Sequence, residues 1–271
     1  MTLVLTGEAP PHRRGSSSAT RVWRGLAIPA ALTVAWLSLA SGEAAGGWPS
    51  LSQVAARAAQ DIQSGVLPAA LVVSLWRDFQ GLLLGGILGV AVGTAIGLSR
   101  LVARTTAPTL HVLKLVSPFA WIPLLMTWFG LGEGSKLAFI ALVGFLPILF
   151  ATIQGVSSVP AHLVELGRVQ RLSEMRIAFS IGLPWAAPAI FSGVYLALIS
   201  TWMGTLGAEY MLTSGGGVGA YLVQARDSFE MDRLIVGVAA VGLVGFALQA
   251  AGRAVEARAL GWRVTLGESQ A

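Results

Sequence analysis

The 271-residue chain has no cysteine and few charged residues. Without cysteine it can form neither disulfides nor thiolate metal sites, although this absence does not identify a cellular compartment. Asp, Glu, Lys and Arg make up 11% of the residues, whereas a soluble globular domain carries about 25%. Apolar residues make up 55%, and the mean hydropathy is +0.72. This composition predicts an all-α integral membrane protein.

Groups for catalysis and metal binding are also scarce. The three histidines fall in different segments, and none has a carboxylate or cysteine at ligand spacing, which argues against a metal site. No grouping of Ser, His and Asp suggests a nucleophile. The stretch GLGEGSKL at 130–137 lacks the adjacent Gly-Lys pair of a phosphate-binding loop. We therefore expect a protein that is not an enzyme and that has no cofactor and no metal.

Six apolar segments are long enough to cross a membrane, since a spanning helix needs roughly 20 mostly apolar residues. They are 25–41, 79–98, 110–129, 137–156, 185–208 and 234–252. An even number of spans places both termini on the same side. With the termini inside, the connecting segments place twelve Lys and Arg residues inside and five outside. This excess predicts cytoplasmic N- and C-termini.

The domain organisation follows from these spans. One transmembrane domain is expected at 25–252, between cytoplasmic tails at 1–24 and 253–271. The first tail is polar and has no convincing signal-peptide cleavage site, so we expect it to be disordered. Segment 48–65 has apolar residues near helical spacing. It predicts an amphipathic helix on the outer membrane surface, with an ordinary solvent loop as the alternative.

The second predicted span carries five glycines at an unbroken spacing of four residues. They are Gly81, Gly85, Gly89, Gly93 and Gly97. This spacing places them along one face of a helix. Because glycine inside a helix costs about 1 kcal/mol relative to alanine, we expect another helix to pack backbone-close there, in the same chain or in a second copy. The alternative is that glycine is simply common in membrane spans.

Two prolines, Pro118 and Pro123, fall in the third predicted span and predict a kinked helix. Carbonyls freed by a kink are tolerated in a membrane only where they face protein or a water-filled cavity. The kinked helix could therefore lie beside a translocation path, or the kink could be purely structural. Lys114 and Glu209 are the ionisable residues nearest the apolar core. An unpaired charge there costs at least ~2.5 kcal/mol. Unless they lie at the headgroups, both are therefore candidates for the path or for a buried ion pair.

A polar stretch at 157–184 separates the fourth and fifth predicted spans. Pro160 suits the first turn of a helix. Apolar residues then recur every third position, at Leu163, Leu166, Val169 and Leu172. Ser173 can cap a second short helix, which is expected to end before Pro184. Two short helices with an apolar edge would project into the cytoplasm and fit a groove on another protein. The alternatives are an inert surface loop and a DNA-binding helix-turn-helix, which would hold a duplex against anionic lipid headgroups.

This stretch resembles the cytoplasmic loop of the permease subunits of binding-protein-dependent ABC importers. The family pattern runs Glu-Ala-Ala, three residues, Gly, nine residues, Ile, one residue, Leu-Pro. The residues that match it at the family spacing are Glu165, Ile181, Leu183 and Pro184. Leu166 and Gly167 stand in place of the two alanines, and Arg171 replaces the glycine. If the bend needs a left-handed residue, an arginine there costs about 1–2 kcal/mol, so the bend is made differently or the partner surface compensates.

The resemblance covers residues 74–262 and is greatest to the subgroup that imports sulfonates, taurine, nitrate and related small compounds. The stretches that carry it are SLWRDFQG (74–81), SPFAWIPLLMTWFGLGEGSK (117–136), AEY (208–210) and GGGVGAYLVQARDSFEMD (215–232). It implies a permease subunit of the bacterial inner membrane that pairs with a second copy. It also implies cytoplasmic ABC ATPase subunits that press on the loop, and a substrate-binding protein that docks outside. The implied contact residues are Glu165, Leu166, Gly167, Arg171, Leu172 and Ser173.

Other functions stay open on the residues alone. In one alternative the chain transports another small solute, such as a pyrimidine vitamin precursor. This alternative stays open because no residue here selects among substrates. A proton- or ion-driven carrier that works without an ATPase is a second alternative, although neither inverted repeats nor midplane charges are clear. A membrane scaffold without a transport role is a third. It predicts that changing Glu165 or Gly167 leaves uptake unaltered.

Overall fold

The computed structural model describes residues 48–212 and 215–259, and within these ranges all regular secondary structure is helical. The chain divides into two units, 1–53 and 54–271. Of the first unit only residues 48–53 are described. There Ser50 N donates to Gln53 Oε1 at 2.7 Å, and Gln53 N donates to Ser50 Oγ at 3.3 Å. This reciprocal capping box begins helix α2 (Leu51–Gln63).

Four helical segments of the second unit are long and apolar enough to cross a membrane. They are α3 (Val66–Leu98), α6 (Glu133–Ser157), the continuous run of α8, η2 and α9 (Glu174–Met211), and α11 (Met231–Ala259). The spans predicted at 79–98, 137–156, 185–208 and 234–252 all lie within these helices. The span predicted at 25–41 and the tail at 1–24 lie outside the described residues. The predicted tail at 253–271 begins inside α11, which continues to Ala259.

The span predicted at 110–129 is not one continuous helix. Helix α4 (Arg100–Leu115) is followed by a 3-10 turn, η1 (Pro118–Trp121), and then by α5 (Ile122–Phe129), with a bend of 94° at the break. Ser117 is extended, with ψ 131°, as expected for a residue before proline. Pro123 occupies the first turn of α5, where its missing N–H is not needed. The prolines thus break the helix instead of kinking it. If the bent pair counts as one span, the described residues hold five.

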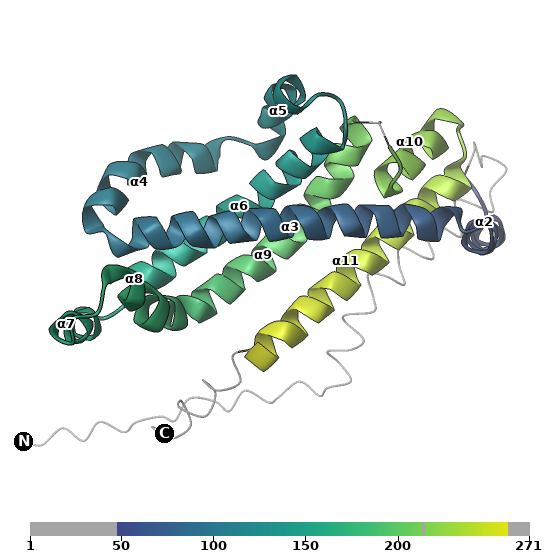
Figure 1. The fold of residues 1–271 in the computed structure, drawn as a ribbon. Coiled ribbons are helices and arrows are strands. Elements are labelled where there is room, and N and C mark those ends of the chain that lie inside the picture. The colour runs from purple at the N-terminus through teal and green to yellow at the C-terminus, as the bar shows by residue number, and fades with distance from the viewer. Residues whose placement is uncertain (1–47, 213–214, 260–271) are drawn as a thin grey trace, which may run out of the picture. The chain divides into compact units, whose positions relative to one another are not determined.

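The glycine stripe of α3 faces α6 of the same chain (Figure 1). Gly81, Gly85, Gly89 and Gly93 are buried there, and Gly97 is half-buried. A Cβ on Gly93 would lie 2.7 Å from Thr152 Cβ, and one on Gly97 would lie 2.8 Å from Val156 Cβ. A larger side chain therefore fits only if α6 moves away. Between helices in lipid, such close backbone approach supplies the van der Waals contact that drives their association.

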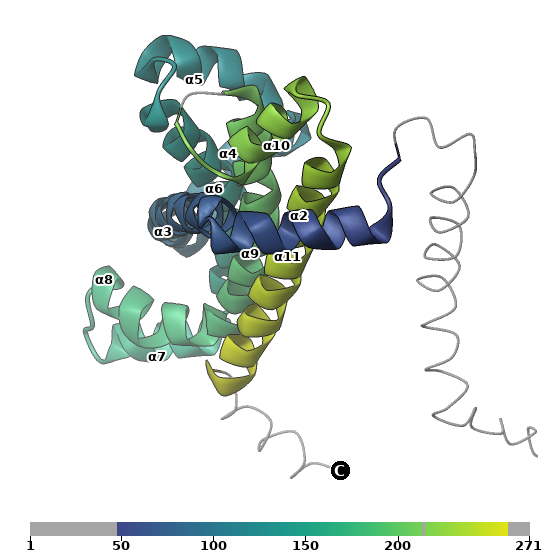
Figure 2. The same ribbon diagram turned by 90° about the vertical axis from the view of Figure 1, so that its right-hand side faces the viewer.

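Helices α7 (Ala161–Val169) and α8 (Glu174–Ile177) lie together at one end of the second unit, called here the loop end (Figures 1 and 2). Helices α3 and α6 both finish here, where Leu98 and Val156 lie beside Gly182. The end of α11 is also here, because Glu256 contacts Ser192 near the start of α9. The loop end therefore gathers the segments around Arg100, 157–184 and 253–259, which the sequence places on one side of the membrane.

Helix α10 (Val218–Asp227) lies at the opposite end, called here the far end (Figures 1 and 2). It packs against α3, α9 and α11, and Tyr221 belongs to a buried apolar cluster there. The Tyr221 hydroxyl donates to Asp61 Oδ2 of α2 at 2.6 Å, and Arg57 of α2 contacts Glu230 at 2.7 Å. Burial and the Asp61 carboxylate raise the pKa of Tyr221, which keeps this donor protonated. The predicted amphipathic segment at 48–65 is thus a helix, and its Asp61 is buried.

Candidate functional site

The loop after α6 turns through a Schellman motif. Leu172 N donates to Gly167 O at 3.1 Å, and Arg171 N donates to Arg168 O at 2.9 Å. These two hydrogen bonds satisfy backbone carbonyls that the end of α7 would otherwise leave unpaired. They require a residue with left-handed backbone geometry directly after the helix C-cap. That residue is Arg171, with φ 58°. The bend therefore has the geometry that suits glycine, although this chain makes it with arginine.

Helix α7 is packed firmly onto the helix that follows the bend. Gly167 is buried, and a Cβ there would lie 3.1 Å from Ile177 Cγ1 and 3.3 Å from Ile181 Cδ1. Ser173 caps the second helix, since its Oγ accepts from Arg176 N at 3.3 Å. The prediction that this helix ends before Pro184 is wrong. Helix α8 continues through a π-helical turn, η2 (Ala178–Gly182), into α9 (Leu183–Met211). The changed hydrogen-bond pattern of this turn lets the helix continue past Pro184, which has no N–H to donate.

An apolar ridge on the loop end is open to its surroundings. Leu166 and Val169 of α7 are 54% and 79% exposed, and Met175 and Phe179 across the bend are 72% and 64% exposed. The predicted edge differs from this ridge, because Leu163 and Leu172 are half-buried. The remaining predicted contact residues, Glu165, Arg171 and Ser173, are exposed beside the ridge. Exposed apolar clusters of this kind mark interaction surfaces.

Glu209 is buried at the far end, where it caps α10. Its two oxygens each lie 2.8 Å from Ser74 Oγ of α3, and its Oε2 accepts from Gly219 N at 2.8 Å. Ser74 Oγ in turn accepts from Val218 N at 2.8 Å. Arg77 of α3 forms an ion pair with Glu209. A carboxylate at a helix N-terminus interacts favourably with the helix dipole, so Glu209 holds α10 in place from α9.

Arg77 joins this carboxylate to a second one. Its Nε lies 2.7 Å from Glu133 Oε2, its Nη2 lies 2.9 Å from Glu133 Oε1, and Nη2 also donates to Gly216 O at 3.2 Å. Lys136 Nζ lies 3.4 Å from Glu133. Arg77 is only 5% exposed, whereas the Glu133 side chain is 60% exposed. We call Ser74, Arg77, Glu133, Lys136 and Glu209 the far-end charge cluster. It ties α3, α6, α9 and the start of α10 together.

Sequence reasoning found Glu209 but missed Arg77 as its partner. The predicted span began at 79, which placed Arg77 in an external connection, whereas α3 begins at Val66 and carries Arg77 inside the bundle. The sequence did contain a signal, because Arg77 and Asp78 directly precede a long apolar run. Charged residues within a membrane span usually face the interior of the bundle and pair with other polar groups. Asp78 accepts from Thr205 of α9 at 3.1 Å.

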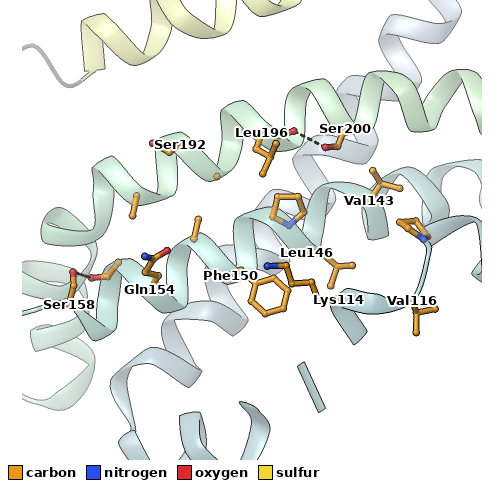
Figure 3. Close-up of a pocket in the computed structure, with 16 residues that line it drawn as sticks. Lys114, Val116, Val143, Leu146, Phe150, Gln154, Ser158, Ser192, Leu196 and Ser200 are labelled. Carbon is orange, nitrogen blue, oxygen red and sulfur yellow. Dashed lines mark hydrogen bonds between the residues drawn. The ribbon is translucent and has the colours of Figure 1, made fainter. Parts of the chain in front are cut away.

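Lys114 does not belong to this cluster. It lies near the end of α4, with Nζ 5.6 Å from the centroid of the Phe150 ring. It lines a cavity of about 740 Å³ whose walls are formed by the facing sides of α6 and α9 (Figure 3). The two ionisable residues singled out by the sequence therefore lie in two different places. One is neutralised in a buried ion pair, and the other is at an open cavity.

Comparison with known sequences bears on what this arrangement does. Residues 81–261 match the family model described as "Binding-protein-dependent transport system inner membrane component". A putative ABC transporter permease of Methanocaldococcus jannaschii is 30% identical over 74% of this chain and 75% of its own length. A putative aliphatic sulfonates transport permease of Bacillus subtilis is 33% identical over 74% and 73%. The nitrate import permease of Leptolyngbya laminosa is 32% identical over 66% and 64%.

Comparison with solved structures supports the fold. A chain of the MetNI methionine ABC transporter, in an inward-facing conformation, superimposes with a TM-score of 0.57. The match covers 69% of this chain and 92% of that chain, with 18% sequence identity. At this identity the likeness concerns the fold alone.

Proposed function

The chain belongs to the family of binding-protein-dependent transport system inner membrane components, and from this membership we propose that it is the permease subunit of an ATP-driven importer in a bacterial inner membrane. It is a multi-pass membrane protein and a transport component, not an enzyme. The loop end faces the cytoplasm in this proposal, in agreement with the excess of Lys and Arg there. A substrate-binding protein then delivers the cargo to the opposite side.

The cargo we propose is a small oxyanion of the sulfonate and nitrate kind. Support comes from relatives that are named for aliphatic sulfonates and for nitrate. These substrates share a compact, negatively charged group of oxygens, so one path can serve both. The alternative cargo is another small solute, such as a pyrimidine vitamin precursor.

The single observation that carries the proposal is the exposed ridge of Leu166, Val169, Met175 and Phe179. It projects from the loop end on a rigid bend. In the proposed assembly the ridge fills a groove on a cytoplasmic ABC ATPase, where apolar anchors would supply most of the binding free energy. Arg168 and Glu174 pair with each other at 3.1 Å beside the ridge and would form part of the polar rim.

The same geometry gives a route from the ATPase to the far end. Gly167 fixes α7 against Ile177 and Ile181, and these residues belong to the continuous helical run Glu174–Met211. At 1.5 Å per residue this run is roughly 55 Å long. Its far end holds Glu209, whose carboxylate caps α10. A displacement of the ridge by the ATPase would therefore be carried as a rigid-body movement to the far-end charge cluster, as in other two-state domain movements.

A second copy of the chain, or a similar permease subunit, completes the proposed assembly. Each copy would present one ridge to one of two ATPase subunits. The path would then open alternately to the two sides of the membrane as the two copies move relative to each other.

The proposal is tested by ATP-dependent uptake of nitrate and ethanesulfonate into vesicles that hold the permease, its ATPase and its binding protein. Val169→Asp places a charge on the ridge and should lower uptake about tenfold or more, because an unpaired charge would be buried at the interface. Gln170→Asp is the matched control, because it adds the same charge at a neighbouring exposed position off the ridge. Equal uptake by both variants would contradict the coupling role. Uptake by the permease alone without ATP would instead identify an ATPase-independent carrier.

A further inference from the structure

The cavity beside α4 has a polar arrangement that the coupling mechanism does not use. Its volume is about 740 Å³, which exceeds what a nitrate or a short sulfonate needs. Among the described residues that line it, Lys114 is the only one with a charge. The rest of the lining is mostly apolar, with a few hydroxyl and amide groups from α6 and α9.

The charge of Lys114 has no acidic partner in the described part of the chain. None of the ion pairs there includes it. Its described neighbour is the Phe150 ring, 5.6 Å from Nζ, a distance at which an ammonium is attracted to an aromatic face. This contact directs the ammonium to the cavity side of α6 without neutralising it (Figure 3).

The other polar groups divide into those whose hydrogen is already used and those free to donate. Ser200 donates to Leu196 O at 2.9 Å, Ser158 donates to Gly155 O at 2.7 Å, and Ser192 lies 3.5 Å from Glu256 Oε1. The side-chain amide of Gln154 has no hydrogen bond in the described part of the chain. Gln154 follows Phe150 by one turn of α6 (Figure 3).

The free donors are therefore the Lys114 ammonium, which lies over the Phe150 ring, and the Gln154 amide, one turn further along α6 (Figure 3). An anion with several oxygens can accept from both donors at once, and hydrogen bonds to a charged group are about twice as strong as neutral ones. A cation would be repelled by the ammonium, and a neutral solute would gain a hydrogen bond from it but no charge–charge attraction. We propose that the cavity lined by Lys114 and Gln154 is a binding station for a small oxyanion on its way through the permease. This inference rests on the proposed function, because it places the cargo of that importer.

The path beyond the station also follows from the helix spacing. Phe150 and Gln154 of α6 and Ser158, the residue that caps its end, succeed one another by four residues, so they follow one face toward the loop end. On α9, Ser200 and Ser192 lie on the opposite wall, with Leu196 between them (Figure 3). The oxyanion would be held most strongly at Lys114 and would then leave past the neutral Gln154 amide toward the loop end, since transport requires release as well as binding.

The absence of cysteine makes a direct test feasible, because one introduced thiol is the only one. Leu146→Cys places a thiol in the lining, one turn from Phe150 and on the side away from Gln154. The full-length chain in lipid nanodiscs is treated with 2-sulfonatoethyl methanethiosulfonate, an anion, and with its trimethylammonium analogue, a cation. Each reagent forms a mixed disulfide with the thiolate and releases methanesulfinate. We expect the anionic-to-cationic rate ratio to exceed that of the exposed control Gln63→Cys by about tenfold, as a local positive potential predicts.

Second variants assign the effect to the two donors. Lys114→Gln should reduce the rate ratio at Leu146→Cys to that of the control, and Lys114→Arg should preserve it. Gln154→Ala should leave the ratio high but weaken the protection that nitrate or ethanesulfonate gives against labelling. An unchanged ratio in Lys114→Gln would overturn the proposal. So would a thiol at 146 that reacts with neither reagent while the thiol at 63 reacts with both, because a second copy or lipid would then fill the cavity.

The source of the anion is decided by the lipid. Protection by nitrate or ethanesulfonate in nanodiscs of phosphatidylcholine supports a station for free oxyanions. If phosphatidylglycerol in the nanodisc protects the thiol at 146 from labelling and nitrate or ethanesulfonate does not, the cavity binds a lipid headgroup and the proposal is overturned. Because labelling needs no ATPase, failure of the station and failure of the coupling mechanism are distinguishable. Failure of the station would leave the labelling ratio at Leu146→Cys unchanged by Lys114→Gln. Failure of the coupling mechanism would leave ATP-dependent uptake equal in Val169→Asp and Gln170→Asp.

Discussion

Arg171 occupies a backbone conformation that an L-residue adopts at a cost. Its φ of 58° corresponds to the left-handed region, which is about 1–2 kcal/mol less favourable for a residue with a Cβ. Because both Schellman hydrogen bonds depend on this conformation, the strain persists as long as α7 ends where it does. The arginine therefore stores strain in the loop that we assign to ATPase contact.

Arg171→Gly should relieve this strain. We expect the melting temperature of the purified chain to rise by about 2–4 °C, the shift that corresponds to roughly 1 kcal/mol in a domain of this size. Gln170→Gly is the control, since Gln170 has φ −76° and glycine there only adds flexibility to the unfolded chain. That control should melt at a lower temperature. A lower melting temperature for Arg171→Gly would show that the arginine side chain makes stabilising contacts that outweigh the strain.

The far-end charge cluster is expected to be sensitive to loss of its buried carboxylate. Glu209→Gln leaves Arg77 buried next to a neutral amide, and breaking a buried pair in this way costs about 3–5 kcal/mol. Glu133→Gln removes the exposed partner of the same arginine and should cost no more than about 1 kcal/mol. Thermal melting of the two variants in detergent measures the difference. Equal shifts for both would contradict the assignment of Glu209 as the buried anchor of α10.

Helices α3 and α6 pack closely over most of their described length, because the glycine stripe allows their backbones to meet. The stripe is therefore a property of the pair and not of α3 alone. The sequence left open whether the neighbour belongs to the same chain or to a second copy. In the structure it is α6. The small residues of α6 also meet α9, since Gly144 lies between Thr201 of α9 and Leu82 of α3, and Gly155 lies against Ala186 of α9.

Gly93→Ala should separate this pair, because the new Cβ would lie 2.7 Å from Thr152 Cβ. Gly86→Ala is the matched control, since a Cβ there would meet Ile148 Cδ1 at 3.5 Å, an ordinary contact. We expect Gly93→Ala to lower the melting temperature and Gly86→Ala to leave it unchanged or raise it slightly, as alanine favours the helix by about 0.5–1 kcal/mol. Equal behaviour of the two variants would contradict the close packing of α3 on α6.

Helix α2 is held at the far end through ionised groups, so its attachment should depend on pH. Hydrogen bonds from Arg233 and Arg57 lower the pKa of Glu230 below its ordinary value of 4.5. A carboxyl group with a lowered pKa stabilises the folded arrangement above its unfolded pKa, and the effect is lost as the pH falls through the folded pKa. The attachment should therefore be intact at neutral pH and weaken below 4.5.

A nitroxide label on Gln63→Cys reports this attachment by its mobility. We expect the label to stay immobile from about pH 7 down to 4.5 and to become more mobile as the pH falls further, through the lowered pKa at which Glu230 gains its proton. In Glu230→Gln the label should already be mobile at neutral pH and should respond less to acid. A mobility that is independent of pH in the unmodified chain would contradict a role for Glu230 in holding α2.

At the scale of the whole molecule, hydropathy identified the helices but could not identify their partners. Four predicted spans lie within long helices, because apolar length is a local property of the chain. The prolines signalled a distortion near 118, whereas the 94° bend depends on what α5 packs against. The contact of Glu209 with Arg77 joins residues 132 positions apart, and no local pattern specifies it. The cavity at Lys114 likewise exists only after α4, α6 and α9 have assembled.

The features of the second unit combine into one account of transport. An exposed apolar ridge at the loop end is fixed to a helix that reaches the far-end charge cluster. Between these two ends lies a cavity lined by Lys114, for which the described residues supply no acidic partner. The ridge would receive the force, the helix would carry it, and the cavity would hold the anion. The central claim is that an ABC ATPase grips the ridge, since without that grip the remaining features describe only a stable bundle.

Cysteine crosslinking tests this claim most directly, because the natural chain has no thiol that could react instead. Val169→Cys on the ridge and Gln63→Cys in α2 are each treated with a short bifunctional thiol-to-amine crosslinker in membranes that contain the ATPase. The account predicts a permease–ATPase product from position 169 and none from position 63. A product from position 63 alone, or no product from position 169 in membranes with active uptake, would contradict it.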